Sequence, residues 1–381
     1  MEALRPETPD QLAESLITAA SAGRTITLGG AFSKNGMAGP VKPSDVTIST
    51  TGLNRILQYE PRDLTISVEA GIRYEDLARA LEENGQILPL DPPFSSEATI
   101  GGILAANTCG SLRRLYGTAR DLLIGMKFAT LEGKLVQSGG MVVKNVAGLD
   151  MGKLLIGSFG TLAAIAVANF KLVPKPPCSG TFLLEFEDVA QAMETRDRIL
   201  HSVLQPTALD LLNAAAAEQL GREGCLIALQ AGGNAAVMER YRRELGAARA
   251  QDEGEEANFW TGVREFTPHF LKRNPEGVIV RASCTLAQVR EVMESFTGPA
   301  VARAASGVCY GYFSENGAAS EWMERATVNG WRPVIEFAPE SKKTGLDLWP
   351  GPGSDFDTMK KVKGMFDPGN LLNRGRLYGR L

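Results

Sequence analysis

Glycines are concentrated in one long stretch of this chain, between residues 98 and 165. Segments such as "ATIGGILAANTCG" and "GGMVVKNVAGLD" carry them at short intervals, and no regular hydrophobic period persists there. Glycine at this density indicates backbone pressed against something, either other backbone or a large flat ligand. Tight turns in an α+β domain would give the same composition, so composition leaves both interpretations open.

A second glycine feature lies in "TLGGAFSKNG", residues 27–36, where a short apolar strand runs into Gly29 and Gly30. Glycine lets backbone approach a ligand closely, and converging N–H groups in such a loop can hold a phosphate. The loop matches neither the G-x-x-x-x-G-K-[ST] nor the G-x-G-x-x-G phosphate motif. An isolated Gly-Gly pair is also common in surface turns, so the motif alone does not name a ligand.

Length and charge narrow the class of protein. A chain of 381 residues favours two domains, and 44% hydrophobic with 22% charged residues is ordinary for a globular protein. The net charge of -4 argues against a nucleic-acid surface, which would need a basic stripe. Five scattered cysteines without a C-x-x-C pair predict neither a disulfide framework nor a metal site, and fit a reducing, cytoplasmic location.

Neither the N-terminus nor the longest apolar run predicts a membrane segment. The start, "MEALRPETPDQLAES", lacks a basic region followed by an apolar core, so we expect no signal peptide. Residues 154–170 carry no charge and approach membrane-spanning length, but they contain glycines and polar residues between Lys153 and Lys171. This pattern favours a buried turn followed by a core strand.

The first part of the chain alternates short strands and helices. Thr8, Pro9 and Gln11 predict the start of a helix that ends at Gly23. Further strands are expected at 24–28, 46–49, 56–60 and 64–71, and a further helix at 74–85.

A proline-rich segment, residues 171–180, marks a boundary. Beyond it the pattern strand-helix-strand-strand-helix occurs twice, separated by a charged loop at 251–260, which predicts a ferredoxin-like antiparallel sheet under helices. The tail offers one amphipathic helix and a "DPGN" turn.

The ordered motifs of residues 98–165, with "FDPGNLLNRGRL" at 366–377, resemble the FAD-binding domain of the vanillyl-alcohol oxidase (PCMH) type. Within that superfamily they look most like the FAD-binding subunit of bacterial glycolate oxidase. The resemblance implies an α+β fold with a two-part PCMH-type FAD-binding domain (1–176), a ferredoxin-like antiparallel-sheet cap domain (177–345) and a C-terminal tail (346–381) that returns to the FAD domain.

The resemblance also assigns the Gly-Gly loop. Gly29, Gly30, Ala31, Phe32 and Ser33 would cradle the FAD pyrophosphate, and a side chain at Gly30 would fill the phosphate site. Some relatives carry a histidine at the place of Phe32 that bonds to the flavin. Phenylalanine has no nucleophile, so we expect non-covalent FAD.

Further cofactor contacts and two catalytic roles follow from the same resemblance. The implied cofactor-binding residues are Thr99, Gly101, Gly102, Asn107, Gly110, Gly117, Arg120, Asp121, Lys144, Asn145, Gly148, Ile165 and Asn373. Lys144 would place a cation near the flavin N1 edge and Arg376 would reach the same site, which makes these two the catalytic candidates. Lys144 could equally be a solvated lysine, and Arg120 and Asp121 a structural ion pair.

The histidine content leaves two functions open. Larger related dehydrogenases carry a histidine-rich metal and substrate motif, whereas this chain has only His201 and His269, far apart. The chain is therefore expected either to oxidise a small 2-hydroxyacid, such as glycolate to glyoxylate, or to relay electrons and support assembly without its own substrate site. The resemblance implies a larger homologous FAD subunit and an iron-sulfur subunit as partners, with at most peripheral membrane association through them.

Overall fold

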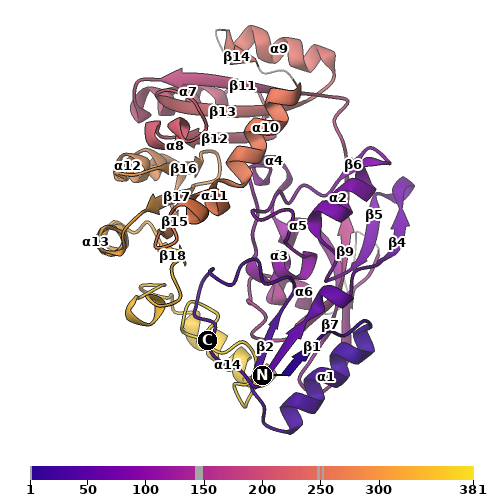
Figure 1. The fold of residues 1–381 in the computed structure, drawn as a ribbon. Helices are drawn as coiled ribbons and strands as arrows, with labels where there is room; N and C mark the ends of the chain where they lie inside the picture. Colours follow the sequence, from indigo (N-terminus) through magenta and orange to yellow (C-terminus); the bar gives the residue numbers. More distant parts are fainter. Residues whose placement is uncertain (1, 142–148, 247–248, 251–252) are drawn as a thin grey trace. The chain divides into compact units, whose positions relative to one another are not determined.

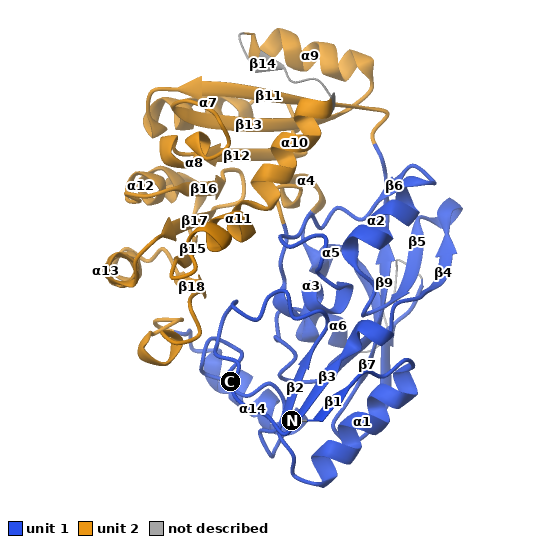
Figure 2. Cartoon of the chain, viewed as in Figure 1, with its two compact units in different colours: residues 1–109, 117–175, 352–381 blue, residues 110–116, 176–351 orange. Residues whose placement is uncertain are grey.

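The computed structural model describes residues 2–141, 149–246, 249–250 and 253–381 (Figure 1). The chain forms two compact units (Figure 2). The first contains residues 1–109, 117–175 and 352–381, and the second contains residues 110–116 and 176–351. The domain limits expected from the sequence, at 176/177 and 345/346, stay a proposal. The tail is part of the first unit.

A parallel three-stranded sheet opens the first unit, in the order β1 (Glu2–Leu4), β3 (Val46–Ser49), β2 (Ile26–Gly29). Helix α1 (Pro9–Ser21) begins where Thr8 Oγ1 accepts a hydrogen bond from the Gln11 N–H at 3.2 Å. Leu12 and Leu16 of this helix are fully buried in one cluster with core residues of the sheet. The predicted helix is therefore confirmed, and its apolar face packs in one core with residues of β2 and β3.

An antiparallel five-stranded sheet completes this unit. Its order is β4 (Ile56–Glu60), β5 (Thr65–Glu69), β9 (Ala164–Lys171), β7 (Leu123–Ala129), β8 (Leu135–Gly139). The polar residues of β5 are buried as well as the apolar ones. One of them, Glu69, has no exposed surface, and its carboxylate forms an ion pair with Arg55 at 2.8 Å.

Short helices and strands fill the remainder of the first unit. They are α2 (Tyr74–Glu82), β6 (Gln86–Ile87), α3 (Ile100–Ala106), α5 (Ala119–Leu122), α6 (Met151–Leu155), β10 (Val173–Pro174) and α14 (Phe356–Phe366). The apolar run 154–170 is the end of α6, a turn and most of β9, as expected. In the described part of the chain, no helix is both long and apolar enough to cross a membrane.

The second unit is built on one antiparallel sheet of eight strands. Their order is β14 (Arg249–Ala250), β11 (Cys178–Phe186), β13 (Cys225–Gly233), β12 (Ala208–Leu212), β16 (Ala300–Arg303), β17 (Val308–Phe313), β15 (Val278–Ser283), β18 (Pro333–Phe337). Its helices are α4 (Arg113–Tyr116), α7 (Val189–Leu200), α8 (Ala214–Glu218), α9 (Ala235–Leu245), α10 (Glu253–Arg264), α11 (Phe266–Arg273), α12 (Val289–Glu294) and α13 (Asn316–Val328). This mixture confirms the predicted antiparallel sheet with helices.

The charged loop predicted at 251–260 is wrong for residues 253–260, which belong to α10. Tertiary contacts explain the difference. The Gln230 side-chain amide donates to the buried Glu256 carboxylate at 3.1 Å, and the Trp260 indole donates to Thr181 Oγ1 at 2.8 Å. Such contacts stabilise a helix whose local charge pattern favours a loop.

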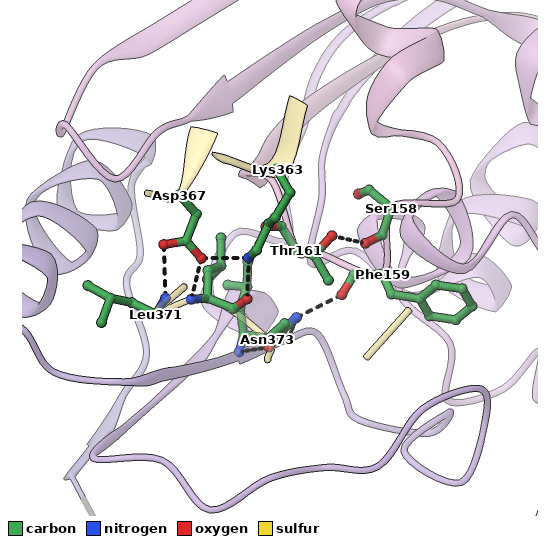
Figure 3. A network of polar contacts seen from close by, with 9 residues as sticks. Ser158, Phe159, Thr161, Lys363, Asp367, Leu371 and Asn373 are labelled. Carbon is green, nitrogen blue, oxygen red and sulfur yellow. Dashed lines mark hydrogen bonds and ion pairs between the residues drawn. The ribbon is translucent and has the colours of Figure 1, made fainter. Parts of the chain in front are cut away.

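A buried ion pair fixes the tail within the first unit (Figure 3). The Lys363 ammonium donates to the Asp367 carboxylate at 2.5 Å, to the Thr161 carbonyl at 2.8 Å and to the Leu372 carbonyl at 3.0 Å. Asp367 also accepts from the backbone N–H groups of Leu371 and Leu372. Burial lowers the pKa of Lys363, and its bond to Asp367 opposes that shift. Each buried charge therefore has its counter-charge and neutral partners.

Replacing Asp367 with asparagine should destabilise the first unit, because the Lys363 ammonium would stay buried without a counter-charge. We expect the free energy of unfolding in urea to fall by about 3 kcal/mol.

Asp357→Asn is the matched control on the same helix. The Asp357 carboxylate is 83% exposed and pairs with exposed Lys360 at 3.2 Å, so its loss should cost less than about 1 kcal/mol. Equal losses in both variants would contradict the role given to the buried pair.

Candidate functional site

A cavity lies at the end of β2 in the first unit, with an empty volume of about 740 Å³ including its mouth. It is lined by Ile26, Thr27, Leu28, Gly29, Gly30, Ala31, Phe32, Ser33, Lys34, Asn35, Val41, Lys42, Ser44, Thr99, Gly102, Ala105, Ala106, Phe159, Asn373, Arg374 and Arg376. The structure thus brings the whole predicted cradle, with Thr99, Gly102, Asn373 and Arg376, to one cavity.

Packing explains both glycines of the cradle. A Cβ atom at Gly30 would lie 2.0 Å from Thr99 Oγ1, and one at Gly29 would lie 2.4 Å from the Phe32 ring. Thr99 caps α3 by accepting a hydrogen bond from the Gly102 N–H at 3.3 Å. A side chain at Gly30 would therefore collide with Thr99, the N-cap of α3. From the sequence, we expect glycine here for another reason, namely that a side chain would fill the phosphate site.

The loop after these glycines offers backbone donors. In the described part of the chain, the N–H groups of Ala31, Phe32 and Ser33 have no hydrogen-bond acceptor. Phe32 has a positive φ of 57°, which turns the backbone at this point. Consecutive N–H groups without protein acceptors, at the wall of a cavity, fit an anionic group such as a diphosphate.

A second, smaller cavity of about 360 Å³ shares a wall with the first. Its lining residues are Leu28, Gly29, Gly30, Thr50, Gly101, Gly102, Ala105, Phe159, Gly160, Ala163 and Ile165. None of these carries a charge, and glycine leaves open backbone surface against which a flat ring can lie. The predicted residues Gly101 and Ile165 are at this second cavity. A cavity with lysines and arginines in its wall, beside an uncharged one, fits the two chemical parts of a dinucleotide such as FAD.

Asn373 holds the strand that leads into the loop. Its side-chain oxygen accepts from the Leu28 N–H at 2.7 Å, and its side-chain nitrogen donates to the carbonyls of Leu28 at 2.9 Å and Phe159 at 2.8 Å. The Asn373 N–H also donates to the Ile26 carbonyl at 2.9 Å. The tail therefore continues the hydrogen bonding of β2. Asn373 positions two residues of the cavity wall, Leu28 and Phe159.

Arg376 braces the next part of the loop. Its guanidinium donates to the carbonyls of Asn35 at 3.1 Å, Lys34 at 3.3 Å and Gly39. These contacts give Arg376 a positioning role for residues 34–39. The catalytic role implied by the resemblance stays a prediction.

Arg120 and Asp121 do not line either cavity and have structural partners. The Asp121 carboxylate accepts from the Thr118 N–H at 2.8 Å and forms a capping box for α5. This bond is the main reason that the pKa of Asp121 lies below its ordinary value. The Arg120 guanidinium donates to the Lys153 carbonyl at 2.9 Å. Gly117 leaves room for Asp121, since a Cβ there would be 2.5 Å from its carboxylate.

Two further predicted residues line neither cavity, and three are outside the described residues. Asn107 is exposed and ends α3 with a φ of 51°, and Gly110 falls in the short segment counted with the second unit. Lys144, Asn145 and Gly148 lie outside the described residues, so their roles stay predictions.

Sequence reasoning missed several lining residues. Lys34 and Lys42 follow the loop in the sequence and line the cavity. The two lysines in "FSKNGMAGPVKP" could have indicated an anion site beside the loop. Phe159 has a positive φ of 52°, which no local pattern indicates for phenylalanine.

Comparison with known proteins agrees with this geometry. Residues 3–139 match the model of an FAD binding domain, and residues 352–377 match that of the C-terminal domain of FAD linked oxidases. The second match covers the tail that contacts β2.

Three curated proteins are similar to the chain. The glycolate oxidase subunit GlcD of Bacillus subtilis is 27% identical, over 86% of this chain and 78% of its own length. The glycolate oxidase subunit GlcE of Escherichia coli is 36% identical over 40% of this chain and 42% of its own length. The D-2-hydroxyglutarate dehydrogenase of Xanthomonas citri is 34% identical over 45% of this chain and 35% of its own length.

A solved structure of alkyldihydroxyacetonephosphate synthase has a similar fold. It matches with a TM-score of 0.73 at 17% identity and covers 97% of this chain and 75% of its own. At that identity the likeness concerns the fold alone.

Gly30→Ala should weaken FAD binding, because the new methyl group displaces Thr99 from the cap of α3 and deforms the cavity wall. We expect the dissociation constant for FAD, measured by flavin fluorescence, to rise about tenfold or more.

Gly364→Ala is the matched control, since a Cβ at this position of α14 meets nothing within 4 Å. It should retain the affinity of the wild type. Equal FAD affinity in the Gly30 and Gly364 variants would refute the loop assignment.

Asp121→Ala should remove a helix cap and leave the FAD affinity unchanged. We expect a loss of about 1 kcal/mol in the free energy of unfolding near neutral pH. The pKa of Asp121 is lowered in the folded state, so its contribution is present above the ordinary value of 3.8 and disappears as the pH falls through the folded pKa. Urea unfolding of both proteins from pH 7 to pH 3 measures this. A parallel loss of FAD affinity would point instead to a cofactor contact.

Proposed function

We propose that this chain, which matches the models of an FAD binding domain and of the C-terminal domain of FAD linked oxidases, is the FAD-binding subunit of a complex that oxidises a small 2-hydroxyacid, with glycolate, converted to glyoxylate, as the substrate. The single observation that carries the cofactor part is the loop at residues 31–33, which lines the cavity and whose three N–H groups have no acceptor among the described residues.

The chain's own residues bind and orient the cofactor in this proposal. Bound FAD supplies a two-electron acceptor. The loop N–H groups bind the diphosphate, Asn373 and Arg376 hold the loop in place, and the uncharged second cavity accepts a flat ring. Phe32 has no nucleophilic atom, so the flavin is held without a covalent bond.

The substrate class rests on the relatives. Glycolate oxidase subunits and D-2-hydroxyglutarate dehydrogenase, by their names, act on a hydroxyl group beside a carboxylate. Glycolate is the smallest acid of this class, and two of the relatives named above are subunits named for it. The subunit names also support a multi-subunit complex, to which we assign a larger homologous FAD subunit and an iron-sulfur subunit.

A second candidate function is electron relay or assembly without a substrate site of its own. Both histidines support it, since His201 and His269 are exposed on helices of the second unit and line neither cavity. Abstraction of the hydroxyl proton needs a general base, for which histidine is the usual residue.

Two buried arginines of the second unit, Arg196 and Arg303, and the half-buried Arg281 support the relay as well. Arg303 forms an ion pair with the buried Asp210, and Arg281 pairs with Glu336 at 3.1 Å. Arg196 donates to the carbonyls of Ala304 at 3.1 Å and Leu286 at 2.9 Å. A substrate carboxylate would need an arginine whose charge is available, and these three already have partners within the unit.

Anaerobic bleaching of the flavin tests the proposal. We expect a yellow protein that releases its flavin on acid precipitation, and bleaching by glycolate in the complex purified with its partners. Bleaching of the isolated chain by glycolate or D-lactate would show that the chain itself oxidises the substrate. Bleaching in the complex alone would favour the second candidate function, electron relay. A colourless protein that cannot be reconstituted with FAD, or a complex that no 2-hydroxyacid bleaches, would contradict the proposal.

A further inference from the structure

The wall of the cavity at the end of β2 is strongly basic. Lys34, Lys42, Arg374 and Arg376 line it, and none of its described lining residues is acidic. The acid beside this wall is Asp45, whose carboxylate accepts from the Thr25 N–H at 2.8 Å and the Thr25 hydroxyl at 2.7 Å. These bonds are the main cause of its lowered pKa, to which the charge of Arg374 adds a smaller part. A cavity with this excess of positive charge attracts an anion.

Three of the four cations hold parts of the protein in place. Arg376 donates to loop carbonyls, as described above, and Arg374 donates to the Pro43 carbonyl at 2.7 Å. Lys34 is 9% exposed, and its ammonium lies 5.9 Å from the centre of the Phe94 ring. These side chains contribute charge to the wall, but their positions are fixed by internal contacts.

Lys42 differs from the other three. Its side chain is exposed, and no described residue forms a hydrogen bond or an ion pair with its ammonium. Its stem runs beside the tail at Gly375, where a Cβ would lie 3.1 Å from Lys42 Cε and 3.3 Å from Lys42 Nζ. Gly375 has a φ of 76°, so a glycine suits both the backbone and the space that Lys42 occupies. The Lys42 ammonium, which has no partner among the described residues, therefore lies beside the tail at a position that lines the cavity.

We propose that Lys42 binds a phosphate oxygen of the FAD diphosphate and is a determinant of cofactor affinity. This inference rests on the FAD site of the proposed function. The loop N–H groups neutralise a diphosphate only partly, because they are dipoles, whereas an ammonium supplies a full charge. The contact is electrostatic and the Lys42 side chain is exposed, so dissolved salt weakens the contact.

Titration of the FAD-free protein with FAD tests this role through flavin fluorescence rather than activity. For Lys42→Gln we expect the dissociation constant to rise roughly five- to tenfold at low salt. Lys42→Arg keeps the charge and should restore most of the affinity. Lys361→Gln, at an exposed position of α14 that does not line the cavity, makes the same change of charge and should bind FAD as the wild type does.

Salt dependence separates a direct contact from a structural defect. Raising NaCl from about 50 mM to about 0.5 M should weaken the wild type toward the Lys42→Gln value and change the variant much less. ADP, which carries the same diphosphate, should displace FAD from the wild type, whereas adenosine should not.

Two results would overturn the role of Lys42. One is wild-type affinity in Lys42→Gln, and the other is a weakened affinity with an unchanged salt dependence. A wild-type chain that binds no FAD at all would instead contradict the cofactor site itself, and so both proposals.

Discussion

The side-chain amide of Asn373 joins three segments that are far apart in the sequence. Through three hydrogen bonds it fixes both backbone groups of Leu28 and the carbonyl of Phe159. The buried pair of Lys363 and Asp367 holds the tail in the position from which the amide reaches them (Figure 3). Because β2 ends directly after Leu28, the direction in which the Gly-Gly loop leaves the sheet depends on the tail. Residues 26–44 and 373–376 thus line one cavity, the proposed cofactor site.

Elements with local signals could be predicted from the sequence. The cap at Thr8 and the strands 46–49 and 56–60 agree with the structure because capping, spacing and turn residues act within a few positions. The burial of Glu69 could not be predicted, since it depends on Arg55, which packs beside it only in the folded sheet. Helix α10 was missed for a similar reason, because its stabilising contacts come from distant strands.

In the candidate site, too, features with a local sequence motif could be predicted, and features that depend on distant segments could not. The loop at 29–33 could be predicted, since its glycines form a motif with the segments that follow. The space beside Gly30 could not, because Thr99 occupies it from another part of the chain. Lys42 was missed since the cavity that it lines is formed together with residues of the tail, far away in the sequence. Asp121, taken from the motif as a cofactor contact, has a local cap as its observed partner, which motif matching does not distinguish from a ligand contact.

The central claim is that the N–H groups of residues 31–33 bind the diphosphate of FAD. Amide hydrogen exchange of this loop, measured with and without FAD, tests it most directly. The account predicts fast exchange at Ala31, Phe32 and Ser33 in the FAD-free protein and strong protection once FAD is bound. Bound FAD with exchange at these three amides as fast as in the FAD-free protein would contradict it and would place the cofactor elsewhere.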